Sequence, residues 1–255
     1  MEARLKMTIQ LQKLEQRQSN NIVINIKRII EANYPLFFYQ IIMRKYIAEF
    51  IGTFALVFCG TGAIIVNEQS NGSLGLIGIA LAFGIIISAM IYVFGNISGT
   101  HINPAVTIAL VIGKLTTLKD ASFYIIAQIL GAILASVLLK FMFSENLTLG
   151  ATIPSSELMQ SFILEFVLTL FLMLTILGVT SKKEFSTIAG LIIGLLVTGI
   201  ILFAGPISGG SFNPARSLAP AIVSGNLTAL WIYIIAPTLG AIVAMLVWKG
   251  INKTE

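Results

Sequence analysis

The sequence predicts an all-α membrane protein with six transmembrane helices and two re-entrant half-helices in an inverted repeat. Three observations lead to this prediction: an apolar composition, six long apolar stretches, and a motif that occurs twice. Of the 255 residues, 56% are hydrophobic and 11% are charged, and the mean hydropathy is +0.93. Soluble domains carry about 25% charged residues, so the composition indicates a protein with several membrane spans.

Six stretches are long enough to cross a bilayer, whose apolar core needs roughly 20 residues of helix. Two further apolar runs, Pro104 to Val111 and Pro214 to Val223, are much shorter, and each follows a Gly- and Ser-rich segment that we expect to be a loop, at 95–99 and 205–209. Such runs enter the membrane without crossing it. The six expected spans are Tyr46 to Val66, Leu74 to Phe94, Phe123 to Phe143, Met159 to Val179, Thr187 to Ala204 and Ala229 to Val247.

The chain repeats itself at a displacement of 110 residues. Ile97-Ser98-Gly99 recurs as Ile207-Ser208-Gly209, and Asn103-Pro104-Ala105 recurs as Asn213-Pro214-Ala215. Each copy carries three spans, and an odd number of spans inverts the second copy in the membrane. The two short runs should therefore meet near the bilayer midplane.

The repeats occupy only part of the chain. The first 42 residues mix Gln, Asn, Lys and Arg with isolated apolar residues, and we assign them no fold. Because Met43 directly precedes the first span, translation starting there is one explanation of this extension. The expected divisions are an N-terminal cytoplasmic extension (1–43), disordered or mis-annotated, a membrane domain (44–250) with repeats of about 44–143 and 157–250, and a C-terminal tail (251–255).

Basic residues set the orientation of the spans. Six lysines fall in the segments that share a side with the N-terminal tail, which is itself basic: Lys114, Lys119, Lys182, Lys183, Lys249 and Lys253. Both termini are therefore expected to be cytoplasmic. The opposite side carries Arg216, and Lys140 near the end of a span, where its long side chain can reach the interface. By default the membrane is taken as the plasma membrane.

Cofactor and enzyme chemistry have little support. The chain has one cysteine, Cys59, and one histidine, His101, so a His/Cys metal cluster and an internal disulfide are both excluded. An intramembrane enzyme would need a nucleophile with a base, or a metal site. We expect no enzyme activity, cofactor or metal, and we expect Cys59 to be a small packing residue in the first span.

The Asn-Pro pairs suit the start of a half-helix inside the membrane. Asn caps the first turn, and Pro fits there because its missing N–H has no partner to lose. Two such helices would direct their positive ends, and the amides of Asn103 and Asn213, at one point. A neutral molecule with an oxygen is held there and a cation is repelled, so the arrangement predicts a pore for neutral solutes that excludes protons and ions.

The stretches Ser98-Gly99-Thr100-His101-Ile102-Asn103-Pro104-Ala105 and Gly209-Gly210-Ser211-Phe212-Asn213-Pro214-Ala215-Arg216 resemble the two signature loops of the aquaporin, or major intrinsic protein, family. The resemblance covers residues 44–250. Around Gly205 to Pro237 it is nearest to the nodulin-like intrinsic proteins and their prokaryotic relatives. It implies a homotetramer in the lipid bilayer with one pore per subunit, and no nucleic-acid partner.

The resemblance also implies a constriction, or selectivity filter, made of Phe83, Ile201, Gly210 and Arg216. An intramembrane cation such as Arg216 is costly and by default functional. Water-selective members place His and a small polar residue or Cys where this chain has Ile201 and Gly210, so its filter should be wider and less polar. That favours a channel for water and small uncharged solutes of the glycerol type, with metalloid hydroxides as further candidates.

Three alternatives and three supporting residues complete the predictions. A strictly water-selective aquaporin stays open within the channel class, and a purely structural membrane-junction role, known for some family members, would leave the filter without a use. An ion-coupled secondary transporter would need further ionisable residues in its spans.

Glu49 and Glu165 occupy equivalent places in the two repeats, so we expect each to accept hydrogen bonds from a broken loop rather than to relay protons. His101 is expected to support or line its loop.

Overall fold

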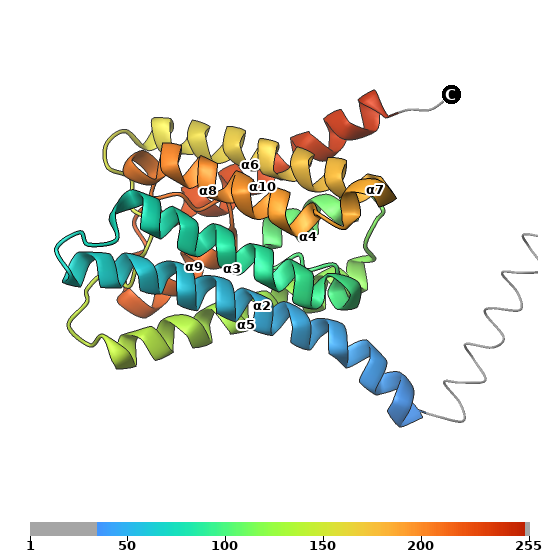
Figure 1. Ribbon diagram of the computed structural model, residues 1–255, viewed down its shortest axis with the longest axis horizontal. Coiled ribbons are helices and arrows are strands. Elements are labelled where there is room, and N and C mark those ends of the chain that lie inside the picture. The colour runs from blue at the N-terminus through green and yellow to red at the C-terminus, as the bar shows by residue number, and fades with distance from the viewer. Residues whose placement is uncertain (1–34, 253–255) are drawn as a thin grey trace, which may run out of the picture. The chain divides into compact units, whose positions relative to one another are not determined.

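The computed structural model describes residues 35–252, and it describes side chains for 43–252 apart from that of Lys183. Within these residues all regular structure is helical, and six helices are long and apolar enough to span a membrane, so the predicted fold class is confirmed (Figure 1). The long helices are α2 (Pro35–Gln69), α3 (Gly75–Ser98), α5 (Leu118–Met142), α6 (Leu158–Ser181), α8 (Ala189–Ser208) and α10 (Leu230–Ile251). The short helices are α4 (Pro104–Ile112), α7 (Lys183–Ser186) and α9 (Pro214–Ser224).

Helix α2 begins earlier than the sequence indicates. The chain separates into two compact units, residues 1–44 and 45–255, and of the first unit the structure describes only 35–44, the opening turns of α2. The part of this helix that is long and apolar enough to span a membrane is Met43–Gln69. The prediction for the extension before residue 35 lies outside the described residues.

The two Gly- and Ser-rich segments expected to be loops are mostly helical. Helix α3 continues to Ser98, and α8 continues through Pro206 to Ser208. Each helix ends where a glycine takes the left-handed conformation, at Gly99 with φ 85° and at Gly209 with φ 81°. The loop prediction is wrong because Gly and Ser weaken a helix without breaking it, and in a membrane an open backbone would cost more than a helical one.

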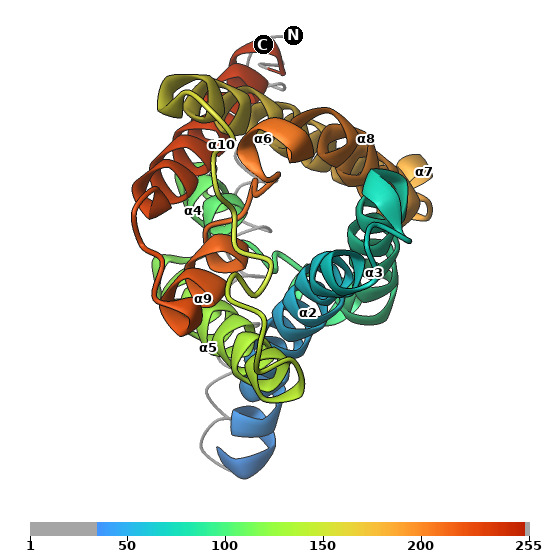
Figure 2. The same ribbon diagram turned by 90° about the vertical axis from the view of Figure 1, so that its left-hand side faces the viewer.

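The two half-helices lie together within the unit formed by residues 45–252. Helix α4 packs against α5 and α10, α9 packs against the same two helices, and α4 and α9 also touch each other. Helix α3 packs along α8, and α6 packs along α10. Figure 2 views these helices from one end and shows α4 and α9 on the side of α5 and α10. Segments far apart in the sequence thus meet at the two Asn-Pro motifs.

Glycines allow the closest helix crossings, as in other membrane bundles. A Cβ atom at Gly131 of α5 would collide with the backbone carbonyl of Phe50 on α2. In the second repeat, a Cβ at Gly240 of α10 would collide in the same way with the carbonyl of Phe166 on α6. Because the obstacle is backbone in both cases, neither position has room for a side chain.

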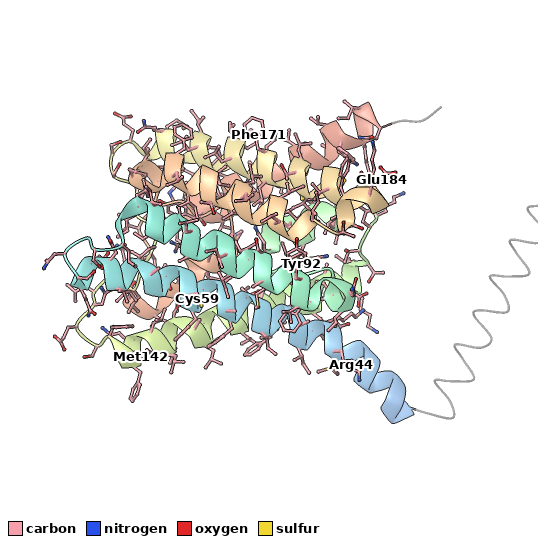
Figure 3. All side chains as sticks on the ribbon, viewed as in Figure 1. Arg44, Cys59, Tyr92, Met142, Phe171 and Glu184 are labelled. Atoms are coloured by element: carbon pink, nitrogen blue, oxygen red, sulfur yellow. The ribbon has the colours of Figure 1, made fainter. Side chains whose placement is uncertain are left out.

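The outer surface of the unit is apolar. Figure 3 shows Cys59 of α2, Tyr92 of α3, Met142 of α5 and Phe171 of α6 on this surface, and all four side chains are exposed. A lipid-facing or subunit-facing surface has this character. Cys59, expected to be a small packing residue of the first span, lies on the outer side of α2 and is exposed, which the apolar sequence around it could not indicate.

Candidate functional site

Each half-helix begins at the asparagine of an Asn-Pro motif. The Oδ1 atom of Asn103 accepts a hydrogen bond of 2.9 Å from the N–H of Ala105. The Oδ1 atom of Asn213 accepts one of 3.0 Å from Ala215 and one of 3.4 Å from Arg216. Pro104 and Pro214 occupy the first helical position, where no donor is lost. Sequence and local structure agree here because the cap needs only these adjacent residues.

The amide groups of the two asparagines connect the repeats. Asn103 Nδ2 donates to the carbonyl of Phe212 at 2.8 Å, and Asn213 Nδ2 donates to the carbonyl of Ile102 at 2.8 Å. An asparagine amide has two N–H donors. On each of the two residues, one N–H binds the loop of the other repeat, and the second N–H remains available. The sequence predicts that these amides point into the lumen, and it does not indicate the exchange, because the partners are backbone carbonyls of the other repeat.

Glu49 holds the loop before α4. Its Oε1 atom accepts from the Ser98 hydroxyl at 2.7 Å and from the N–H of His101 at 2.8 Å. Its Oε2 atom accepts from the N–H of Ile102 at 2.6 Å and from Gln128 Nε2 at 2.8 Å. The carboxylate is fully buried, and four donors surround it.

Glu165 holds the loop before α9 in the same way. Its Oε1 atom accepts from the Ser208 hydroxyl at 2.7 Å and from the N–H of Ser211 at 2.9 Å, and its Oε2 atom accepts from the N–H of Phe212 at 2.7 Å. These donors belong to the last residue of α8 and to the loop before α9, so the carboxylate is engaged in holding that loop. Both glutamates therefore lie where loop support requires them.

The two loops share an unusual backbone conformation. The left-handed region, which costs a non-glycine residue roughly 1–2 kcal/mol, is occupied at three matching positions of each loop: Gly99, Thr100 and Ile102 in the first, and Gly209, Gly210 and Phe212 in the second. This conformation turns successive N–H groups toward the glutamate. The carboxylate hydrogen bonds offset the backbone strain, which explains why each loop depends on one buried acid.

A central cavity of about 320 Å³ runs beside both loops. Residues from α2, α3, α4, α6, α8 and α9 line it, together with the loops before α4 and α9. Phe83, Ile201, Gly210 and Arg216, the four residues of the expected filter, all line this cavity, as do Asn103, Asn213 and His101. Much of the remaining lining is aliphatic, including Leu56, Ile87, Leu172 and Val197.

Arg216 is a fully buried residue in the lining of the cavity. Its Nη1 atom donates to the carbonyl of Gly150 at 2.8 Å, and its Cζ atom lies 5.0 Å from the ring centroid of Phe83. Its Nε and Nη2 atoms are buried, and among the described residues they have no hydrogen-bond partner. Buried donors of a charged group are nearly always satisfied, so these two unsatisfied donors set Arg216 apart from the other buried polar residues of the site.

The segment between α5 and α6 takes part in the site, which sequence reasoning missed. Besides Gly150, it supplies Thr152, whose hydroxyl donates to the Ser217 hydroxyl at 2.7 Å. Ser217 in turn lies 2.5 Å from the Ser211 hydroxyl. The segment has no motif that could have revealed these contacts, because its contribution to Arg216 is a backbone carbonyl.

His101 packs against its own repeat. Its Nδ1 atom lies 3.1 Å from the Thr107 hydroxyl, and its ring meets the Tyr124 ring edge-on at 4.9 Å between centroids. Across residues 35–252, no group of three or more His, Cys, Asp or Glu side chains is placed to hold a metal ion. Nothing near His101 therefore indicates metal chemistry.

Comparisons with known proteins agree with this geometry. The family described as "Major intrinsic protein" matches residues 39–248. The chain is 41% identical over 223 residues to aquaporin NIP2-1 of Arabidopsis thaliana, covering 84% of this chain and 77% of that protein. It is 39% identical over 215 residues to nodulin-26 of Glycine max, covering 84% and 79%. The X-ray structure of the aquaglyceroporin from Plasmodium falciparum aligns with a TM-score of 0.75 and 27% identity, over 83% of this chain and 97% of that one.

Proposed function

The chain belongs to the major intrinsic protein family and is a membrane channel for water and small uncharged solutes such as glycerol, and we propose that four residues select what it passes. These residues are Phe83, Ile201, Gly210 and Arg216. The observation that carries the proposal is the pair of unpartnered donors on Arg216, buried beside Phe83 in the cavity.

The filter suits a solute with a carbon backbone and hydroxyl groups. Arg216 Nε and Nη2 supply donors for the hydroxyl oxygens, while Phe83 and Ile201 supply apolar surface for the carbons. Gly210 adds no side chain, and a Cβ there would already lie 3.5 Å from Ile201 Cγ1. Glycerol fits this description, and uncharged metalloid hydroxides share its pattern of hydroxyl groups.

Exclusion of protons and cations is the second part of the proposal. The positive ends of α4 and α9 face each other, because Asn103 and Asn213 cap the two helices and are joined through each other's loops. Arg216 adds a full charge on the same path. A cation crossing the membrane would meet both fields without a compensating carboxylate, since Glu49 and Glu165 are occupied by loop donors.

Stopped-flow light scattering on proteoliposomes tests this function. Under an impermeant osmolyte the vesicles should shrink fast, and under glycerol they should shrink and then reswell at a rate that depends on the protein. Arg216→Ala should keep the water flux and admit erythritol faster relative to glycerol, because the filter loses its largest side chain. Arg44→Ala is the control, since Arg44 is exposed and outside the cavity.

The outcomes separate the alternatives. Fast shrinkage without reswelling would identify a strictly water-selective aquaporin. Solute entry that collapses when an ionophore removes the ion gradient would identify an ion-coupled secondary transporter. Absence of any acceleration would contradict the channel and leave a structural role.

The remaining proposals concern the setting of the channel. We propose a homotetramer in the plasma membrane with both termini in the cytoplasm, no cofactor and no catalytic activity. The family resemblance supports the tetramer, and the exposed apolar side chains on the outer surface are compatible with subunit contacts. The mass of the detergent-solubilised particle measures the oligomeric state. Glu49, Glu165 and His101 are proposed as supports of the two loops.

A further inference from the structure

Each of the four filter residues has a counterpart in the other repeat, 110 positions away in the sequence. Moving back or forward by 110 positions takes Ile201 to Ile91, Gly210 to Thr100, Arg216 to Val106 and Phe83 to Ile193. All four of these counterparts line the central cavity. Because the repeats are inverted, they lie in the half of the cavity on the other side of the Asn-Pro motifs.

Thr100 has the backbone conformation of its counterpart. Its φ is 48°, and that of Gly210 is 59°. At Gly210 this conformation aims a Cβ atom at Ile201, 3.5 Å from its Cγ1 atom. Thr100 and Ile91, the counterparts of these two residues in the first repeat, both line the cavity.

The Thr100 hydroxyl has no partner. It is buried, only 7% of the residue is exposed, and among the residues that the structure describes nothing accepts from or donates to its Oγ1 atom. The neighbouring backbone N–H of Thr100 is already bonded to the Ser98 hydroxyl at 3.0 Å, so the loop does not use Oγ1 for its own support. Buried hydroxyl groups are nearly always hydrogen-bonded. Like the free donors of Arg216, it is placed for an occupant of the cavity.

The three other members of the set are aliphatic. Ile91, Val106 and Ile193 have no hydrogen-bonding side-chain atoms, whereas the filter carries a guanidinium at the position of Val106. Apolar constrictions oppose the passage of water by dewetting. In such a ring the Thr100 hydroxyl is a single hydrogen-bonding group, and it can bind a solute that carries hydroxyl groups.

We propose that Ile91, Thr100, Val106 and Ile193 form a second selecting ring, in which Thr100 Oγ1 hydrogen-bonds the hydroxyl groups of small polyols and the three aliphatic side chains contact their carbons. This inference rests on the proposed solute channel. A polyol leaving the Arg216 filter passes the free N–H groups of the asparagines and then reaches Thr100. The ring therefore favours polyols over water at the second half of the path.

Thr100→Val is the direct test, because Val keeps the shape and β-branching of Thr and removes only the hydroxyl. Glycerol and water permeability are measured on the same proteoliposomes for the wild type, Thr100→Val and Thr100→Ser. The glycerol-to-water ratio should fall about three- to tenfold in Thr100→Val, the range for the loss of one hydrogen bond, and Thr100→Ser should keep the wild-type ratio. Thr238→Val is the control, since that hydroxyl bonds to the Ile234 carbonyl outside the cavity.

A second variant tests the proposal if Thr100→Val does not fold. Thr100→Gly takes the residue that the other repeat has at this conformation, so it removes the hydroxyl without backbone strain. It should also lower the glycerol-to-water ratio, with a faster water flux through the wider ring. An unchanged ratio in Thr100→Val or Thr100→Gly would overturn the proposal while leaving the channel function intact, as would an equal loss of both fluxes. Wild-type vesicles that conduct neither solute would instead contradict the channel function itself.

Discussion

Single buried carboxylates determine the shape of both pore loops. Glu165 receives two backbone N–H groups and one hydroxyl, and the loop it holds carries Gly210 and the cap of the helix that presents Arg216. The position of Arg216 thus depends on a residue that does not touch the cavity. Arg216 is also held by the hydrogen bond that its Nη1 atom donates to the Gly150 carbonyl.

Replacing Glu165 by Ala should destabilise the protein more than it changes selectivity. Three buried donors would lose their acceptor, and each unsatisfied donor costs about 1–3 kcal/mol, so the free energy of unfolding should fall by several kcal/mol. The midpoint of thermal unfolding in detergent measures this loss. Glu157→Ala is the control, because Glu157 is exposed and makes no capping hydrogen bond at the start of α6. A variant that kept the wild-type midpoint but lost a proton conductance present in the wild type would instead show that Glu165 relays protons.

At the scale of elements, two of the helix crossings without room for a side chain match each other in the repeats. Gly131 and Gly240 occupy matching places in the repeats, and each faces a backbone carbonyl of the first helix of its repeat, at Phe50 or Phe166. Backbone cannot rotate away as a side chain can. The separation of α6 and α10 is therefore set by glycine.

Gly240→Ala should lower the free energy of unfolding by about 1–3 kcal/mol, the usual cost of overpacking. Thermal unfolding of the purified protein in detergent is the measurement. Gly250→Ala on the same helix is a matched control: no atom lies within 4 Å of its Cβ position, and Ala favours a helix over Gly by roughly 1 kcal/mol. If both variants unfolded at the same temperature, the crossing would be looser than described.

The sequence predicted those elements whose signals are local. Length and hydropathy identified the spans, and Asn-Pro identified both half-helices, because a cap involves neighbouring residues. The ends of α3 and α8 were predicted too early, since Gly95 and Gly205 look like loop residues until the membrane environment is considered. The contact between Gly150 and Arg216 was missed because a backbone carbonyl has no sequence signature.

At the scale of the whole molecule, the inverted repeat fixes which segments share a side of the membrane. With cytoplasmic termini, the segment between α5 and α6 faces outward and the segment between α6 and α8 faces the cytoplasm. The basic residues Lys182 and Lys183 lie in the second of these segments. The side of the membrane on which each segment lies therefore gives the orientation of the protein without any measurement of transport.

Cysteine labelling in intact cells should show this orientation. In a Cys59→Ser background, Ser144→Cys should react with an impermeant maleimide from outside, whereas Lys182→Cys should react only after lysis. Both positions are exposed, so accessibility alone does not separate them. The reverse pattern of labelling would contradict cytoplasmic termini.

The exchange of hydrogen bonds between the asparagines has a consequence for the order of synthesis. Asn103 and Phe212 are 109 residues apart, which a ribosome covers in roughly 5–20 s at about 5–20 residues per second. During that interval the first half-helix has neither the carbonyl it donates to nor the amide that completes its loop. Glu49 supports this loop from within the first repeat, but the two hydrogen bonds that join it to the second repeat are missing. The re-entrant segment of the first three spans is therefore complete only after the second Asn-Pro motif has emerged.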